Sequence, residues 1–99
     1  MARSRKKLRP MSPMPRVSRD REIDLHGMIV DEALMRLAEE INACVRYGEE
    51  YLRVNHGKGG GTLRLAVRGM LARHPLVIRH FSAQPNAGGD GVTVLQLSV

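Results

Sequence analysis

Two short segments of the sequence each carry a histidine that precedes a glycine, and each has residues suited to acid–base or phosphate chemistry. In the first segment, Asp24 and His26 stand two positions apart in a stretch that alternates polar and apolar residues. Side chains two apart on a strand point to the same face, so the carboxylate can orient the imidazole as a general base. Ordinary polar residues on an exposed strand face have the same pattern, so the spacing alone leaves that alternative open.

The second segment is a glycine-rich loop whose composition suits a phosphate group. Glycines let backbone N–H groups approach an anion closely, and the start of a following helix adds a partial positive charge. Neither a Walker loop nor a dinucleotide-binding fingerprint has this spacing. A flexible turn has the same composition, so both interpretations stand. The segment consists of His56, Gly57, the mobile cation Lys58, Gly59, Gly60 and Gly61.

A metal site is the least specific of the possible chemistries. Asp24, His26 and His56 could act as ligands, but two histidines and one acid form no defined metal signature. The single cysteine, Cys44, excludes an internal disulfide and a cysteine-based zinc site. We therefore predict no resident metal in this chain.

Apolar periodicity divides the remaining sequence into strands and helices. Residues 22–26 and 51–56 alternate as strands do, and residues 30–45 repeat apolar side chains at helical spacing before Gly48. A second helix is predicted with Thr62 as its N-cap.

The second half of the chain continues this alternation. The second helix should end at residues 74–75, where a proline follows a histidine. Residues 76–83 and 92–97 are predicted strands, separated by a loop over residues 85–91 that contains three glycines. The last strand is apolar on both faces, which favours a central position.

The resulting order, β-α-β-α-β-β, predicts an α+β fold. Helical crossovers make the first three strands parallel, a hairpin-like connection makes the fourth antiparallel, and right-handed crossovers place both helices on one face. This is a two-layer sandwich with a four-stranded mixed sheet, and its open face could serve a partner or a dimer contact. The loops at the carboxyl ends of the parallel strands should meet, bringing the two His-Gly segments together.

The net charge of +6 is concentrated at the beginning of the chain. Residues 1–21 hold eight basic side chains and one acid, a net of +7, so residues 22–99 carry −1. Residues 1–21 show no apolar period and are predicted to be a disordered basic tail, followed by a folded domain over residues 22–99. The tail is either a solubilising extension or a polycation that attracts phosphates or anionic lipid.

No apolar run is long enough for a membrane span, and no apolar core follows the basic start as in a secretory signal. Three prolines, at positions 10, 13 and 15, would break the amphipathic helix of a transit peptide. We therefore expect a cytoplasmic protein with no membrane partner.

The basic side chains in the second half of the chain are expected at different positions relative to a bound ligand. Arg53 is expected on the open side of its strand, and Arg64 in the first turn of the second helix, near the glycine loop. Arg68 and Arg73 are expected to be ordinary solvated side chains of that helix. Arg53 and Arg64 are therefore added to the phosphate-binding candidates.

Both His-Gly segments resemble motifs of one known family, in order and at natural spacing. Residues 23–27 (Ile-Asp-Leu-His-Gly) resemble the LDLHG motif of the small MutS-related (Smr) domain, and residues 56–59 resemble its HGxG motif. The sequence looks like a short stand-alone member, with no MutS-type ATPase region. Other matching parts are Gly61, Leu63 and Arg64, residues 74–77 and residues 88–94.

This resemblance implies a fold like the C-terminal domain of bacterial translation initiation factor three. It also implies nucleic-acid binding and, in many members, endonuclease activity, either nicking DNA or cutting messenger RNA on stalled ribosomes. Asp24 and His26 match the residues usually held responsible for activity, and residues 56–59 match the other candidate segment.

Two positions depart from the family pattern. Ile29 stands where many members have a threonine that would cap the first helix, with Asp31 as a candidate replacement, and Asn55 stands where an apolar residue is usual.

The leading hypothesis is an endonuclease that acts on RNA more readily than on DNA. His26, oriented by Asp24, would activate a 2′-hydroxyl, and His56 would protonate the leaving oxygen or hold the phosphate. A DNA substrate would require activated water and a divalent ion such as Mg²⁺ or Mn²⁺. The rival hypothesis is a non-catalytic module that binds DNA, RNA or the ribosome, as a monomer or a weak dimer.

Overall fold

Strands and helices alternate along residues 21–99, the part of the chain that the computed structural model describes. The tail predicted over residues 1–21 lies outside the described residues except for Arg21, which already belongs to the first strand and whose Nε donates to Glu40 at 2.9 Å. Within the described part, no helix has the length and apolar character to cross a membrane. The main elements are β1 (Arg21–Asp24), α1 (Val30–Arg46), β2 (Tyr51–Asn55), α2 (Thr62–Arg73), β3 (Val77–Ser82) and β4 (Val92–Leu97).

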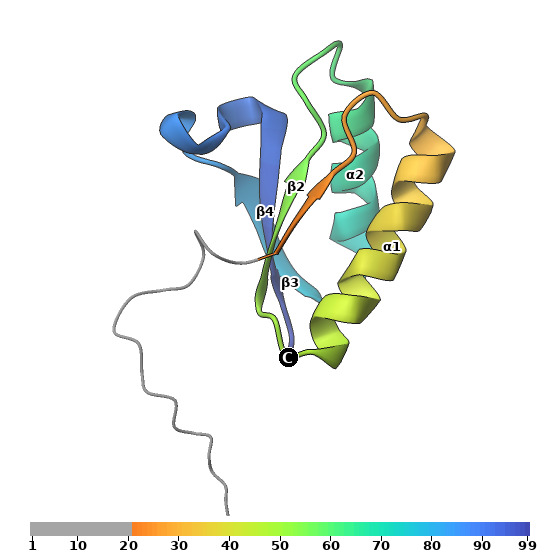
Figure 1. Ribbon diagram of the computed structural model, residues 1–99, viewed down its shortest axis with the longest axis vertical. Helices are drawn as coiled ribbons and strands as arrows, with labels where there is room; N and C mark the ends of the chain where they lie inside the picture. The colour runs from red at the N-terminus through yellow and green to blue at the C-terminus, as the bar shows by residue number, and fades with distance from the viewer. Residues whose placement is uncertain (1–20) are drawn as a thin grey trace, which may run out of the picture.

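The four strands form one mixed sheet in the order β1-β2-β4-β3. β1 and β2 are parallel, whereas β4 is antiparallel to both of its neighbours, so β1, β2 and β3 run in the same direction. Both helices lie on one face of the sheet, and the loops that follow β1 and β2 lie at the same end (Figure 1). The predicted α+β two-layer sandwich is confirmed, including the central position of β4.

The core between the two layers is built almost entirely from aliphatic side chains. Each helix presents one apolar stripe to the sheet, and the strands contribute alternate residues, as their sequence periods predict. The buried cluster comprises Ile23, Leu25, Ala33, Leu37, Ile41, Cys44, Leu52, Val54, Val67, Leu71, Leu95 and Leu97.

The connection between β3 and β4 forms two short 3-10 turns, η2 (Pro85–Ala87) and η3 (Gly89–Gly91). This loop is tied to the sheet because Arg53 donates from Nη2 to the Ala87 carbonyl at 2.8 Å. Ala87 also packs against a small apolar cluster on the other face of the sheet, formed by Ala83, Val92 and Val94. The sheet face opposite the helices is therefore partly covered at the end where the His-Gly segments lie.

The start of α2 differs from its prediction. Thr62 is the first residue of the helix, and the N-cap is Gly61, whose φ of 88° lies in the left-handed region that a threonine rarely adopts. No side chain caps α2, and its first turn holds no acid. The unpaired N–H groups at this end remain available to a ligand. The start of α1 also has no side-chain cap, since Ile29 occupies that position and Asp31 does not replace the threonine.

The burial pattern of α1 yields a prediction about stability. Replacing the fully buried Leu37 by alanine is expected to lower the free energy of unfolding by about 2–5 kcal/mol, through lost burial and the cavity left behind. Met35, on the same helix, is 66% exposed, so its replacement by alanine should change stability by less than about 0.5 kcal/mol. Urea unfolding of both variants measures the difference, and equal midpoints would contradict the packing described above.

Candidate active site

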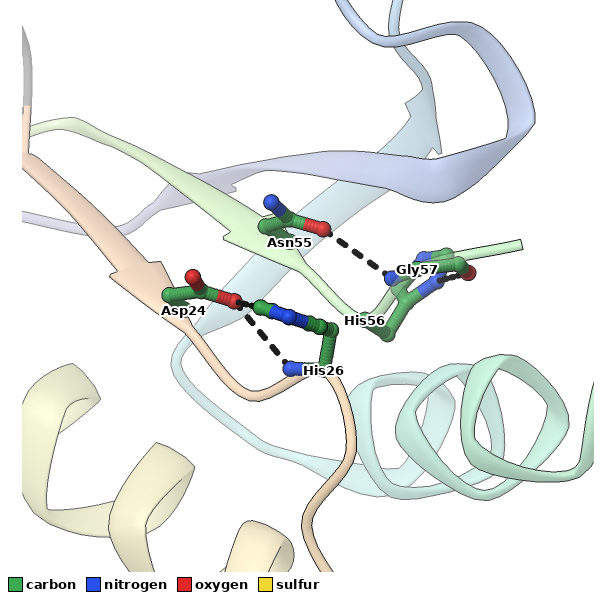
Figure 2. A network of polar contacts seen from close by, with 5 residues as sticks. All are labelled: Asp24, His26, Asn55, His56 and Gly57. Carbon is green, nitrogen blue, oxygen red and sulfur yellow. Dashed lines mark hydrogen bonds and ion pairs between the residues drawn. The ribbon is translucent and has the colours of Figure 1, made fainter. Parts of the chain in front are cut away.

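Asp24 and His26 form a directly hydrogen-bonded pair at the end of β1. The Oδ1 atom of Asp24 lies 2.6 Å from Nδ1 of the His26 ring and accepts the backbone N–H of His26 at 3.1 Å (Figure 2). A carboxylate only accepts, so Nδ1 carries the proton, and Nε2 is the ring nitrogen that can take up another. Both side chains are more than half exposed, so a substrate can reach them.

The pair also fixes the charge state of its carboxylate. The hydrogen bond from the His26 ring, followed by the one from the His26 backbone N–H, lowers the pKa of Asp24 below its ordinary value. Asp24 therefore remains an anion throughout the neutral range, which is the state that holds the imidazole.

His56 has the opposite environment. It is only 4% exposed, its Nδ1 lies 2.9 Å from the Gly57 carbonyl oxygen, and its Nε2 lies 2.8 Å from Oγ1 of Thr93. The carbonyl requires a proton on Nδ1, so Nε2 accepts from the threonine hydroxyl and the ring is neutral. Burial lowers the pKa of His56, and the positive charges of Arg68 and Arg64 lower it further, against the opposing effect of the Gly57 carbonyl.

This geometry changes the role expected for His56. From the sequence, His56 was expected to protonate the leaving oxygen or to hold the phosphate. Both ring nitrogens instead bind the protein itself, because the ring lies beneath the loop on the buried face of β2. His56 is thus placed to hold the glycine loop in shape.

The glycine loop packs tightly against both neighbouring segments. A Cβ atom on Gly57, which has a φ of 74°, would lie 3.2 Å from Cβ of His26. The N–H of Gly57 donates to Oδ1 of Asn55 and to the Gly91 carbonyl, each at 3.0 Å. Asn55 stands where the family pattern usually has an apolar residue, and it gives the loop a side-chain acceptor that an apolar residue could not provide (Figure 2).

A cleft of about 250 Å³ opens between the loop, the turn after β1 and the first turn of α2. Arg64 lines it from α2, and Lys58 lines it from the exposed part of the loop. Lys58, Arg64 and residues 57–61, which were predicted to bind phosphate, thus lie together at this cleft. Backbone N–H groups, two cations and an uncapped helix end make the cleft suited to an anion.

Arg53 does not belong to this cleft. Its Nη2 binds the Ala87 carbonyl, and its Nε lies 3.3 Å from Oε1 of Glu22, so the guanidinium connects β1, β2 and the η2 turn. It was predicted to contact phosphate, but these two partners give it a structural role on the far side of the sheet from α2.

Arg68 was predicted to be solvated, and that expectation is wrong. Its Nε lies 3.3 Å from Oγ1 of Thr93, and its Nη2 donates to the hydroxyl of Ser82. The arginine extends from α2 to the sheet, where it completes a polar network beneath His56. Thr93 was not among the predicted site residues, although its place in a strand that is apolar on both faces signals a buried hydroxyl that needs a partner.

Three potential metal ligands, Asp24, His26 and His56, do not come together as a site. Two nitrogens of His56 are already bonded within the protein. Among residues 21–99, no group of three or more His, Cys, Asp or Glu side chains is placed to hold a metal ion.

Taken together, these features define a two-layer α+β domain with an exposed carboxylate–imidazole pair beside a glycine-lined, cationic cleft. The Smr domain model matches residues 23–98, so the chain belongs to the Smr domain family. It is 47% identical over 89 residues to an endonuclease MutS2 from Thermomicrobium roseum and 42% identical over 77 residues to one from Thermus thermophilus. These matches cover 90% and 78% of this chain but only 11% and 10% of the relatives, so the chain spans about a tenth of their length.

Solved structures agree with this assignment. The Smr domain of Thermus thermophilus MutS2 superimposes with a TM-score of 0.79 at 40% identity, covering 80% of this chain and 99% of that domain. The SMR domain of NEDD4-binding protein 2 gives a TM-score of 0.62 at 28% identity, covering 81% of this chain and 88% of that one. YdaL, a stand-alone small MutS-related protein from Escherichia coli, shares the fold, with a TM-score of 0.75 at 23% identity over 79% of this chain and 64% of its own.

The buried neutral His56 predicts a pH dependence of stability. Its pKa in the folded state lies below the ordinary value of 6.5, so below that pH the unfolded chain binds a proton that the folded chain does not. The free energy of unfolding should therefore be undiminished above pH 6.5 and fall as the pH drops toward the folded pKa. The slope for this one proton is limited to about 1.4 kcal/mol per pH unit.

Urea unfolding at pH 5 to 8 measures this slope. The variant His56→Gln should be less stable at pH 7.5 and show a flatter profile between pH 5 and 6.5, where the low pKa of Asp24 keeps that group from titrating. An unchanged slope in the variant would mean that His56 is not the group responsible.

Proposed function

We propose that this chain is a nucleic-acid endonuclease of the Smr type that acts on RNA in preference to DNA. The observation that carries the proposal is the 2.6 Å contact between Asp24 and Nδ1 of His26, on exposed side chains next to the anion-suited cleft. The name endonuclease, borne by the MutS2 relatives, supports the same class of activity.

The reaction begins with His26 as general base. Asp24 holds the proton on Nδ1, so Nε2 accepts the proton of a ribose 2′-hydroxyl. The 2′-oxygen then attacks the adjacent phosphorus, and the bond from phosphorus to the 5′-oxygen of the next nucleotide breaks. The products are a 2′,3′-cyclic phosphate and a 5′-hydroxyl, whose proton comes from water, and the imidazolium returns its proton to solvent.

The cleft supplies electrostatic stabilisation in this proposal. Negative charge that develops on the phosphate oxygens is met by N–H groups of residues 58–61, by Lys58 and by Arg64 at the start of α2. The N–H of Gly57 takes no part, because it already donates to Asn55 and to the Gly91 carbonyl. His56 acts from beneath as a positioning residue. DNA has no 2′-hydroxyl, so it lacks the nucleophile on which this route depends.

The acid–base pair is tested by Asp24→Asn and His26→Gln on labelled RNA. Each should lower the cleavage rate by about 10²–10⁴, the usual contribution of a general base and of its orientation. The matched control is Asp31→Asn, which changes an exposed carboxyl of α1 that does not line the cleft and should cleave like the wild-type chain.

Product analysis tests the route itself. RNA products should end in a cyclic phosphate and form in the presence of a chelator, whereas a DNA of the same sequence should remain intact under those conditions. Full cleavage activity in both Asp24→Asn and His26→Gln would contradict the mechanism. Binding without product at saturating protein would instead leave the chain as a nucleic-acid-binding module.

The basic beginning of the chain is proposed to supply sequence-independent attraction. Residues 1–20 hold seven basic side chains and one acid, a net of +6. Deleting them should weaken RNA binding and flatten its salt dependence, since each phosphate neutralised contributes about 0.7–0.9 to the slope of log K against log salt. Binding isotherms at 50–200 mM salt measure both quantities. The cleavage rate of the bound complex should survive the deletion, and an unaltered slope would remove this role.

A further inference from the structure

A fully buried hydroxyl lies directly beneath the glycine loop. Thr93 has no exposed surface and faces the helix layer from β4, on the same face as Leu95 and Leu97. A hydroxyl in such a position requires hydrogen-bond partners. It has two, since Oγ1 lies 2.8 Å from Nε2 of His56 and 3.3 Å from Nε of Arg68.

The direction of these hydrogen bonds follows from the chemistry of the partners. Arg68 can only donate, so Thr93 accepts from it. The buried hydroxyl proton of Thr93 needs an acceptor, and of these two partners only Nε2 of His56 can be one. The other ring nitrogen of His56 must then carry the ring proton, which is donated to the Gly57 carbonyl at 2.9 Å.

The opposite tautomer would be costly at this position. A lone pair on Nδ1 would face the lone pairs of the Gly57 carbonyl oxygen, and the peptide between Gly57 and Lys58 would have to turn. A trans peptide directs its C=O and N–H to opposite sides. Fixing the Gly57 carbonyl on the His56 ring therefore also fixes the N–H of Lys58, a residue that lines the cleft.

We infer that Thr93 and Arg68 are positioning residues that set the tautomer of His56 and thereby the orientation of the loop peptides in the cleft. Arg68 is itself anchored by Ser82 on β3, so α2, β3 and β4 all contribute to the network. The effect on cleavage rests on the proposed function, whereas the effect on the His56 tautomer does not.

The test combines nitrogen NMR of the labelled imidazoles with cleavage kinetics on RNA. The wild-type chain should show His56 protonated on Nδ1 alone at pH 7.5. Thr93→Val, which keeps the shape and removes the hydroxyl, should give a mixture of tautomers and lower kcat about tenfold, with KM changed less than about twofold. Thr93→Ser should restore both the single tautomer and the rate.

Arg68→Met provides an independent variant if the valine substitution impairs folding, which circular dichroism would detect. Loss of the Arg68 donor leaves a lone pair of the buried Thr93 oxygen unpaired, and a proton on Nε2 of His56 would fill it, so mixed tautomers are again expected. Arg73→Met, at an exposed position on the same helix, is the matched control and should resemble the wild-type chain. A single Nδ1–H tautomer in both Thr93→Val and Arg68→Met would overturn the inference. Absence of cleavage by the wild-type chain would overturn the proposed function. The NMR result alone would then decide whether Thr93 and Arg68 set the tautomer of His56.

Discussion

The carbonyl oxygen of Gly91 accepts the backbone N–H groups of both His56 and Gly57, each at 3.0 Å, and the rest of the site depends on this junction. It joins the end of β2 to the beginning of β4. A Cβ atom on Gly91 would lie 3.2 Å from Cγ of Lys58, so a side chain there would press on the glycine loop, and a glycine lets the two loops approach closely. Because β4 starts at this point, Thr93 comes to lie beneath the His56 ring.

The same junction explains why two His-Gly segments, so similar in sequence, have different environments. His26 follows the edge strand β1, where its ring is hydrogen-bonded to the Asp24 carboxylate and most of the side chain is exposed. His56 follows the interior strand β2, where β4 and α2 cover it and Thr93 and Gly57 take both nitrogens. Position in the sheet therefore determines, more than local sequence does, which histidine can contact a substrate and which supports the loop.

Much of this arrangement could be predicted because it rests on local periodicity. The two helices, the strand directions and the meeting of the loops after β1 and β2 follow from apolar spacing and crossover handedness. The burial of His56 could also be predicted from the sequence, since it continues the alternation of Leu52 and Val54 on the buried face. The role of Arg68 could not be predicted, because its partners belong to β3 and β4, and only the folded sheet brings Ser82 and Thr93 to one helix residue.

These placements also change the meaning of the charge distribution. Residues 51–80 appear strongly basic in sequence, yet three of their arginines have partners within the fold. Arg53 binds Glu22 and the Ala87 carbonyl, Arg68 binds the hydroxyls of Thr93 and Ser82, and Arg79 binds Gln96. At the cleft itself the charged side chains are Lys58 and Arg64. Two cations and a set of backbone dipoles suffice to orient one phosphate but give little long-range attraction to a polyanion. Under the proposed function, recognition of a long nucleic acid therefore draws on charge outside the cleft, and residues 1–20 hold the largest excess of it in the chain.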